Sequence, residues 1–284
     1  MKLGLFAVLL WSSTPTASAG STYLIFGSKL SGWIAVDPKT HRVEALHFPA
    51  PFKPEAIAIS RHGTELVFTA FHPPARNVLL FRWQRNSSGS PVSIGDDRGY
   101  HSDPSLSEDG QWVYFAHNPL AFGPPGQHQG QAYAQLYRVR LDGTQLMPLT
   151  EESGCHFGPT NATGEQLIYL YTTCSGDRVL RRLDLKKLIS IDLHKAGWAF
   201  NEASASPDSR AVLISIGGFD SVSIAEVDLR SLQMRTVLRI AGASPPVRPR
   251  YGAQRNEIFY QARGAVWVSQ GNSTNQIAQL LGEP

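Results

Sequence analysis

A short turn followed by an apolar run recurs along the chain, and this repeat restricts the possible folds more than any other feature of the sequence. The turns end at positions 63, 110, 164, 209 and 255, so neighbouring turns lie 45 to 54 residues apart. The apolar runs that follow them cover 65–69, 112–116, 166–170, 211–215 and 257–260. A period of this length is typical of a repeated unit of four short strands.

The unit from 103 to 150 shows the expected strands most clearly. Glu108-Asp109-Gly110 and Asp142-Gly143 mark two tight turns, and glycine can take the positive φ that such turns often need. Before the second turn, apolar and basic side chains alternate, as they do in a half-buried strand. A single sheet of this kind leaves two faces to cover, so neighbouring units must pack on it. The four predicted strands are 104–107, 112–116, 136–141 and 145–149.

Six such units predict an all-β fold, a six-bladed β-propeller of four-stranded antiparallel blades with almost no helix. We expect a closed ring because closure removes exposed sheet edges, whereas a linear stack would need capping repeats. The first unit shows only three strands, near 23–27, 32–36 and 42–48; either the chain terminus supplies a fourth or this blade has three. The units cover 21–49, 55–93, 101–150, 155–193, 201–240 and 247–281.

Ser107-Glu-Asp-Gly110 and Ser206-Pro-Asp-Ser209 each precede an apolar strand, and the stretch 136–144 is followed by Leu149-Thr150. These motifs resemble the repeats of the TolB-type, WD-repeat-like propellers. The resemblance implies a propeller fold and, as an expectation, a role as a periplasmic partner in an envelope complex. TolB carries an additional α/β domain, for which we expect no room here. Related propellers also serve as domains of peptidases, which need a hydrolase domain, and as oligogalacturonate lyases, which need a metal cluster.

The first residues have the pattern of a secretory signal. Lys2 is basic, residues 3–11 are apolar but too short to span a bilayer, and Ala17-Ser-Ala19 fits a signal-peptidase site. We therefore predict a signal peptide over 1–19, a single propeller domain over 20–284, and a periplasmic or secreted protein. The alternative is that the apolar stretch forms a buried first strand. No later segment is long and apolar enough to predict a transmembrane helix.

Charge and motifs favour a binding protein over an enzyme. The formal net charge is only +3 and no run of lysine or arginine occurs, so we expect no nucleic-acid partner. The sequence has no Gly-x-Ser-x-Gly elbow, no phosphate loop and no His-Glu-x-x-His motif, and no catalytic residue can be named. We predict a non-catalytic scaffold that binds a protein or envelope component. The alternative is a metal-dependent carbohydrate-active enzyme, a lyase or hydrolase.

Polar residues near the beginnings of the first strands predict a site at one mouth of the central channel. First strands line the channel of a propeller, so these side chains are expected to converge there. The rim could also be hydrated and bind nothing specific, or it could hold a small molecule, sugar or peptide. His101, Asp103 and His156 are the candidates for a divalent metal. The predicted site residues are His101, Asp103, His156, Asn201, Glu202, Arg248 and Arg250.

The longest insertion in a repeat is 117–131, on the face where we expect the channel mouth. A long loop in a compact repeat is either functional or mobile, and the hypothesis is that it covers the mouth or contacts a partner.

The two cysteines of the chain, Cys155 and Cys174, are predicted to form a disulfide. Cys155 opens the first strand of its unit and Cys174 ends the second, and strands joined by a tight turn are antiparallel, so the two ends are neighbours. An oxidising compartment favours the bond, and two thiols alone are too few for a zinc site.

We expect that reduction of this disulfide lowers the free energy of unfolding by about 3 kcal/mol, because the bond restricts the unfolded chain. Urea denaturation with and without reductant measures the change, and a Cys155→Ala/Cys174→Ala variant should be insensitive to reductant. Alkylation of both thiols in the unreduced, unfolded protein, seen by mass spectrometry, would contradict the pairing.

Overall fold

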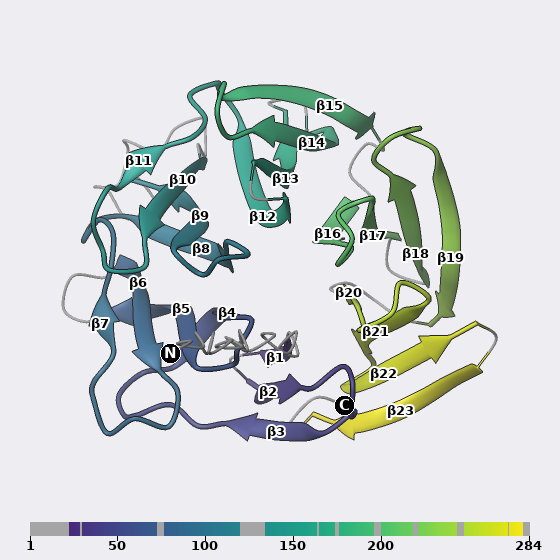
Figure 1. Cartoon of the computed structure of the whole chain (residues 1–284), viewed down its shortest axis with the longest axis horizontal. Helices are drawn as coiled ribbons and strands as arrows, with labels where there is room; N and C mark the ends of the chain where they lie inside the picture. The colour runs from purple at the N-terminus through teal and green to yellow at the C-terminus, as the bar shows by residue number, and fades with distance from the viewer. Residues whose placement is uncertain are drawn as a thin grey trace, which may run out of the picture.

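The computed structural model describes residues 23–28, 30–72, 77–119, 134–163, 165–173, 176–195, 200–217, 221–242, 247–271 and 273–280. Every regular element in these residues is a β-strand, and the sheets stand side by side in a ring (Figure 1). The chain is therefore an all-β propeller with four-stranded antiparallel blades, as the repeat predicts. The described part contains no helix long and apolar enough to cross a membrane.

Three sheets have four antiparallel strands, and in each sheet strands that follow one another in sequence are neighbours. The first strand of each sheet lies toward the centre of the ring and the fourth lies outside (Figure 1). The strands are β12 (Cys155–Thr163), β13 (Gln166–Thr172), β14 (Arg178–Asp184) and β15 (Ile189–Lys195); β16 (Phe200–Ala205), β17 (Ala211–Gly217), β18 (Ser221–Asp228) and β19 (Met234–Ala241); and β20 (Arg248–Tyr251), β21 (Glu257–Ala262), β22 (Ala265–Gln270) and β23 (Ser273–Gln279).

A larger sheet of eight strands contains two antiparallel halves, β4 to β7 and β8 to β11. Among the described residues, the halves pair only through a parallel contact between Val78 and Tyr100. Each half has the strand order of one repeat unit. The strands are β4 (Pro54–Ile59), β5 (Glu65–His72), β6 (Asn77–Gln84), β7 (Val92–Ser93), β8 (Tyr100–Leu106), β9 (Trp112–Asn118), β10 (Gln135–Arg140) and β11 (Met147–Pro148).

The first sheet has three described strands, β1 (Leu24–Ser28), β2 (Gly32–Val36) and β3 (Val43–Leu46). The β2–β3 turn matches two turns that join third and fourth strands elsewhere, the β14–β15 turn and the β18–β19 turn. The N–H of His41 donates to the carbonyl of Asp37, as Leu188 does to Asp184, and all three turns of this type have a non-glycine residue near φ 57° at their fifth position. β1 therefore occupies the second position of its sheet, and the described residues provide no strand for the innermost position.

The tight turns of different units share their hydrogen bonds, which explains why they share a sequence. In one turn the Ser107 hydroxyl donates to Asp109 at 2.6 Å and accepts from the Trp112 N–H at 2.9 Å. Ser206 makes the same pair of bonds, to Asp208 at 2.6 Å and from the Ala211 N–H at 3.0 Å. Each serine thus closes the turn and starts the following strand.

The apolar core consists of separate layers, each between neighbouring sheets. One layer joins Leu180 and Ile168 of one sheet to Ile214 and Val227 of the next. A further layer closes the ring, because Phe26 in the first sheet packs with Phe259 in the last. Both phenylalanines are fully buried.

Polar contacts also join the first sheet to the last, at the closing seam of the ring. The side-chain oxygen of Gln261 accepts a hydrogen bond from the Gly27 N–H at 2.9 Å. At the other end of the sheets, the His41 Nε2 lies 2.8 Å from the buried Glu257 carboxylate. The ring thus closes by packing and side-chain contacts between the first and last sheets.

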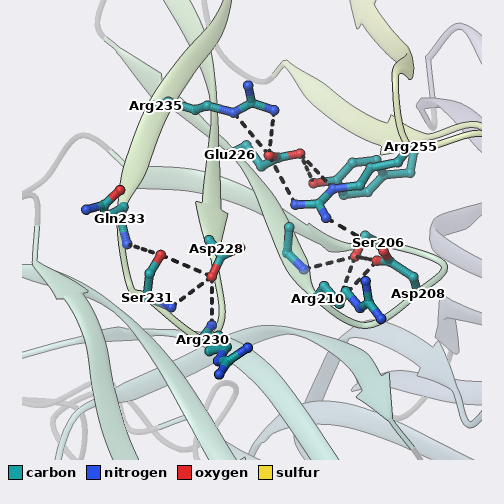
Figure 2. Close-up of polar contacts among 12 residues, drawn as sticks. Ser206, Asp208, Arg210, Glu226, Asp228, Arg230, Ser231, Gln233, Arg235 and Arg255 are labelled. Carbon is teal, nitrogen blue, oxygen red and sulfur yellow. Dashed lines mark hydrogen bonds and ion pairs between the residues drawn. The ribbon is translucent and has the colours of Figure 1, made fainter.

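Glu226 on β18 joins two neighbouring sheets through one buried carboxylate (Figure 2). It accepts hydrogen bonds from Arg235 at 2.9 Å and from the Tyr251 hydroxyl at 2.9 Å, and the Arg255 guanidinium lies 3.3 Å away. Burial would raise the pKa of Glu226, but hydrogen bonds from Arg235, Arg255 and Tyr251 outweigh it, so this pKa lies below its ordinary value of 4.5. The carboxylate is therefore ionised at neutral pH.

Several sequence predictions fall on residues that the structure does not describe. They are the signal peptide over 1–19 with the mature start at Gly20, most of the insertion 117–131, the turn residue Gly164 and the disulfide partner Cys174. They therefore stay predictions from the sequence.

We expect Glu226→Ala to lower the free energy of unfolding by about 3 kcal/mol, because it removes the acceptor shared by two arginines and a tyrosine. Urea denaturation at pH 7 measures the loss. Because the folded pKa of Glu226 is depressed, its stabilisation is present above about pH 4.5 and declines as the pH falls further. The control Glu108→Ala removes a carboxylate whose side chain is 68% exposed, and should cost less than about 1 kcal/mol. Equal losses in the two variants would contradict the proposed role of Glu226.

Candidate functional site

The central channel contains a cavity of about 540 Å³. Its walls come from the innermost strands β4, β8, β12, β16 and β20, from β1 with Trp33 of β2, and from the tight turns that follow the inner strands, among them Arg61, Glu108 and Pro207. A volume of this size suits a small ligand or a few residues of a peptide.

Bulges in the inner strands decide which side chains reach this cavity. The pairing of β8 with β9 shifts between Ser102 and Ser105, and the pairing of β16 with β17 shifts between Phe200 and Ala203. A bulge re-aims the side chains that it carries. Asp103 lies in the first bulge and has a positive φ of 51°. Glu202 lies in the second, and both residues line the cavity.

The bulge in β8 separates His101 from Asp103. In a regular strand, residues two apart point to the same face. Instead, His101 is fully buried away from the channel, with its ring centroid 5.1 Å from that of Phe115 and 4.7 Å from that of His117. His156 is also fully buried, 5.5 Å from Tyr169 and 4.9 Å from Tyr171 between ring centroids. The two histidines therefore pack in the layers between sheets and do not line the cavity.

Four of the predicted site residues do meet in the cavity: Asp103, Glu202, Arg248 and Arg250. The Arg248 Nε lies 3.6 Å from the Glu202 carboxylate. Burial raises the pKa of both carboxyls, Asp103 and Glu202. The charges of Arg250 and then Arg248 act in the opposite direction on Glu202, and the charge of Arg248 does so on Asp103. The side chain of the remaining predicted residue, Asn201, is not among the described ones.

The two arginines differ in how far the protein satisfies them. Arg248 donates to the Gly27 carbonyl at 2.5 Å and lies over the Trp33 ring, in addition to its contact with Glu202. Arg250 donates to the carbonyl of the preceding residue, Pro249, at 2.9 Å. Within the described residues no carboxylate lies at ion-pair distance from Arg250, and burial lowers its pKa. Arg250 is thus a half-buried cation that interacts with the charge of Glu202 without forming an ion pair, and it has donors left for a ligand.

Sequence reasoning missed the wall residues Trp33 and Gly158. The Gly158 N–H donates to Asp103 at 3.4 Å and helps to hold that carboxyl in place. The signal for this geometry was the proline at equivalent positions, Pro104 and Pro159, because a proline inside an inner strand marks a bulge.

A metal site over His101, Asp103 and His156 finds no support in the geometry. Across the described residues, no group of three or more histidine, cysteine, aspartate or glutamate side chains is arranged to hold a metal ion. The three candidates lie in different surroundings, because only Asp103 reaches the cavity.

No protein-family model and no curated protein matches the sequence. Among solved structures, TolB from Acinetobacter baumannii is similar with a TM-score of 0.69 and 14% identity, over 92% of this chain and 65% of that one. A chain of a nidogen/laminin complex is similar with a TM-score of 0.66 and 12% identity, over 91% and 96%. An oligogalacturonate lyase in complex with manganese has a TM-score of 0.58 and 14% identity, over 92% and 74%. The fold is therefore that of the TolB-type propellers, and the chain spans less than two thirds of the Acinetobacter protein.

The buried histidines give the protein a predictable pH dependence. Burial lowers the pKa of His101 to about 3 and that of His156 to about 4, and neither has a side-chain hydrogen-bond partner among the described residues. As the pH falls below about 6.5, these histidines are protonated in the unfolded chain but not in the folded one. Stability is therefore complete above pH 6.5 and falls by about 2 kcal/mol per histidine by pH 5.

We expect His101→Phe/His156→Phe to remove most of this loss between pH 7 and pH 5, as measured by urea denaturation at each pH. The exposed His62 provides the control, because His62→Gln should leave the pH dependence unchanged. A double variant that loses stability as steeply as the unsubstituted protein would refute the assignment.

Proposed function

We propose that this protein is a non-catalytic binding scaffold of the cell envelope, whose channel cavity binds an extended segment of a partner protein or envelope component. The observation that carries the proposal is Arg250, a cation in a cavity of about 540 Å³ that has no carboxylate at ion-pair distance among the described residues. A small molecule or sugar that carries a carboxylate is the other ligand class that this chemistry suits.

We propose that the ring has six blades. The eight-stranded sheet has the strand order of two repeat units, and one parallel residue pair joins its halves. We propose that each half is one blade, and the three-stranded first sheet and the three sheets of four strands are the other four blades of the proposed six. A ring of six rigid blades holds the cavity walls in place without a ligand, so little ordering is needed on binding.

The cavity offers a peptide two kinds of contact. A guanidinium binds a carboxylate through two parallel hydrogen bonds, which fixes the direction as well as the position of the ligand. Among the described strands β1 pairs only with β2, and its residues Leu24 and Ile25 line the cavity. A free strand edge can accept an added strand through main-chain hydrogen bonds. An extended acidic peptide uses both.

The location follows from the signal pattern. We propose that residues 1–19 are removed and that the mature domain, 20–284, is periplasmic or secreted, where a Cys155–Cys174 disulfide is stable. The fold shared with TolB and with a chain of the nidogen/laminin complex supports a protein-binding role. The insertion 117–131 joins β9 to β10, at the end of the sheets opposite the tight turns, and is proposed to contact a partner there.

The alternative, a metal-dependent carbohydrate-active enzyme, is supported by one feature of the cavity. Asp103 and Glu202 are two carboxyls whose pKa values are raised by burial, and such groups can act as an acid. The shared fold with an oligogalacturonate lyase points the same way. Elemental analysis of purified protein tests this alternative. It predicts a stoichiometric content of a divalent metal, and a lower metal content in the Asp103→Asn variant.

We expect Arg250→Gln to abolish capture of partners that the unsubstituted protein retains from a periplasmic extract, as measured by quantitative mass spectrometry. The exposed Arg239 gives a matched control with the same change of charge, and Arg239→Gln should retain the partners. Circular dichroism checks that both variants are folded. A partner set that is the same for all three proteins would count against the channel as the binding site.

A further inference from the structure

A second cavity, of about 530 Å³, opens between the sheet β12–β15 and the sheet β16–β19. It lies at the ends of the strands that carry the tight turns, because Arg210 belongs to the β16–β17 turn and Arg230 to the β18–β19 turn. Arg182 of β14 and Arg255 of the β20–β21 turn complete its charged wall. Four arginines from three sheets therefore line one cavity.

Among the described residues, three of these guanidinium groups make no hydrogen bond or ion pair, although the charge of Arg210 acts on the nearby Asp208. Figure 2 shows that the contacts of Arg210 and Arg230 involve their main-chain N–H groups, which donate to Ser206 and Asp228. In the part of the chain that the structure describes, no hydrogen bond or ion pair engages the side chains of Arg182, Arg210 or Arg230. Arg255 differs, because it is held by Glu226 at 3.3 Å and by Asp208 at 3.6 Å.

The charge of the cavity is not balanced by its own residues. Asp228 is the single carboxylate in the wall, and its Oδ1 already accepts from the N–H groups of Arg230 at 3.0 Å and Ser231 at 2.8 Å. Like charges gathered in a concave site repel one another and raise the local potential, which attracts anions. Folding has thus placed four cations around one cavity, where they do not stabilise each other.

We propose that this cavity binds a ligand that carries two or more adjacent phosphate groups. Three unpaired guanidinium groups in a space of about 530 Å³ need a comparable number of negative charges close together. Adjacent phosphates supply that density, and their oxygens accept the paired hydrogen bonds that a guanidinium donates. Neighbouring acidic side chains of an extended peptide alternate in direction, so they deliver fewer charges to one point. A free polyphosphate and a phosphorylated lipid headgroup share the required chemistry.

The wall is built to hold the arginines in place. The Ser206–Asp208 contact and the Asp228 cap fix the turns that carry Arg210 and Arg230, and Glu226 fixes Arg255 (Figure 2). Exposed Leu232 and Met234 follow Arg230 on the same hairpin and would face a lipid surface if the phosphate belongs to a headgroup.

Titration calorimetry at low ionic strength with tripolyphosphate as the probe tests the proposal. We expect saturable binding that weakens as salt is added. Arg182→Gln/Arg210→Gln/Arg230→Gln should bind at least about tenfold more weakly, because each guanidinium lost removes charged hydrogen bonds. The control Lys53→Gln/Arg98→Gln/Arg239→Gln lowers the net charge equally at exposed positions away from the cavity, and should bind normally.

Further variants keep the test decisive. Arg210→Gln alone changes an exposed turn residue and should weaken binding even if the triple variant does not fold. Asp228→Asn keeps an oxygen acceptor for the turn and should tighten binding. Arg250→Gln should have no effect, so that failure of the channel proposal and failure of this one are distinguishable. Absence of binding, equal weakening in the control, or equally tight binding of a glutamate-rich peptide would each overturn the proposal.

Sedimentation with phosphatidic acid vesicles separates the two sources of phosphate. Vesicle binding that depends on Arg182, Arg210 and Arg230 assigns the site to a lipid headgroup, whereas binding of tripolyphosphate alone assigns it to a soluble ligand.

Discussion

Face-to-face packing of neighbouring sheets is the interaction on which the rest of this structure depends. Each sheet has two apolar faces, and only a neighbour on each side removes both from water. The layers that join Leu180 to Ile214 and Phe26 to Phe259 are local instances of this requirement. Because every sheet needs two neighbours to bury both of its faces, the sheets form a closed ring. The ring leaves a channel at its centre. The position of the candidate site is therefore a consequence of how the core is buried.

Departures from regular strand pairing then determine which side chains line the channel cavity. A regular inner strand would direct alternate residues into the layers between sheets. The bulges at Asp103 and Glu202 turn two carboxyls into the cavity, which Arg248 and Arg250 also line. The same bulge leaves His101 in an apolar layer beside Phe115. His101 and Asp103 are only two residues apart in sequence, but the first packs between sheets and the second lines the cavity.

The fold could be predicted from the sequence because its signals are local. The serine and aspartate of the turns at 107–110 and 206–209 bond to each other and to the next strand, so the turns are recognisable wherever they occur. The site was predicted only in part, since alternation assigns His101 and Asp103 to one face and cannot reveal a bulge. Pro104 and Pro159 mark the bulges at Asp103 and Gly158, whereas the bulge at Glu202 has no such signal in the sequence. The sequence does not show which positions the three strands of the first sheet occupy. These positions follow from the hydrogen bonds of the Asp37–His41 turn, once they are compared with those of the other turns. The charged residues around Glu226 and the second cavity are far apart in sequence, so no local sequence pattern predicts that they lie together.

Arg248 has a further consequence, because it belongs to the channel and to the closing seam at once. Its guanidinium contacts Glu202 in the cavity and the carbonyl of Gly27 in the first sheet, while its own strand belongs to the last. A ligand that engages the cavity charges therefore also acts on the junction between the two ends of the chain. If the proposed ligand binds in the channel, its binding and the closure of the ring are thermodynamically linked, and it favours the closed ring by mass action.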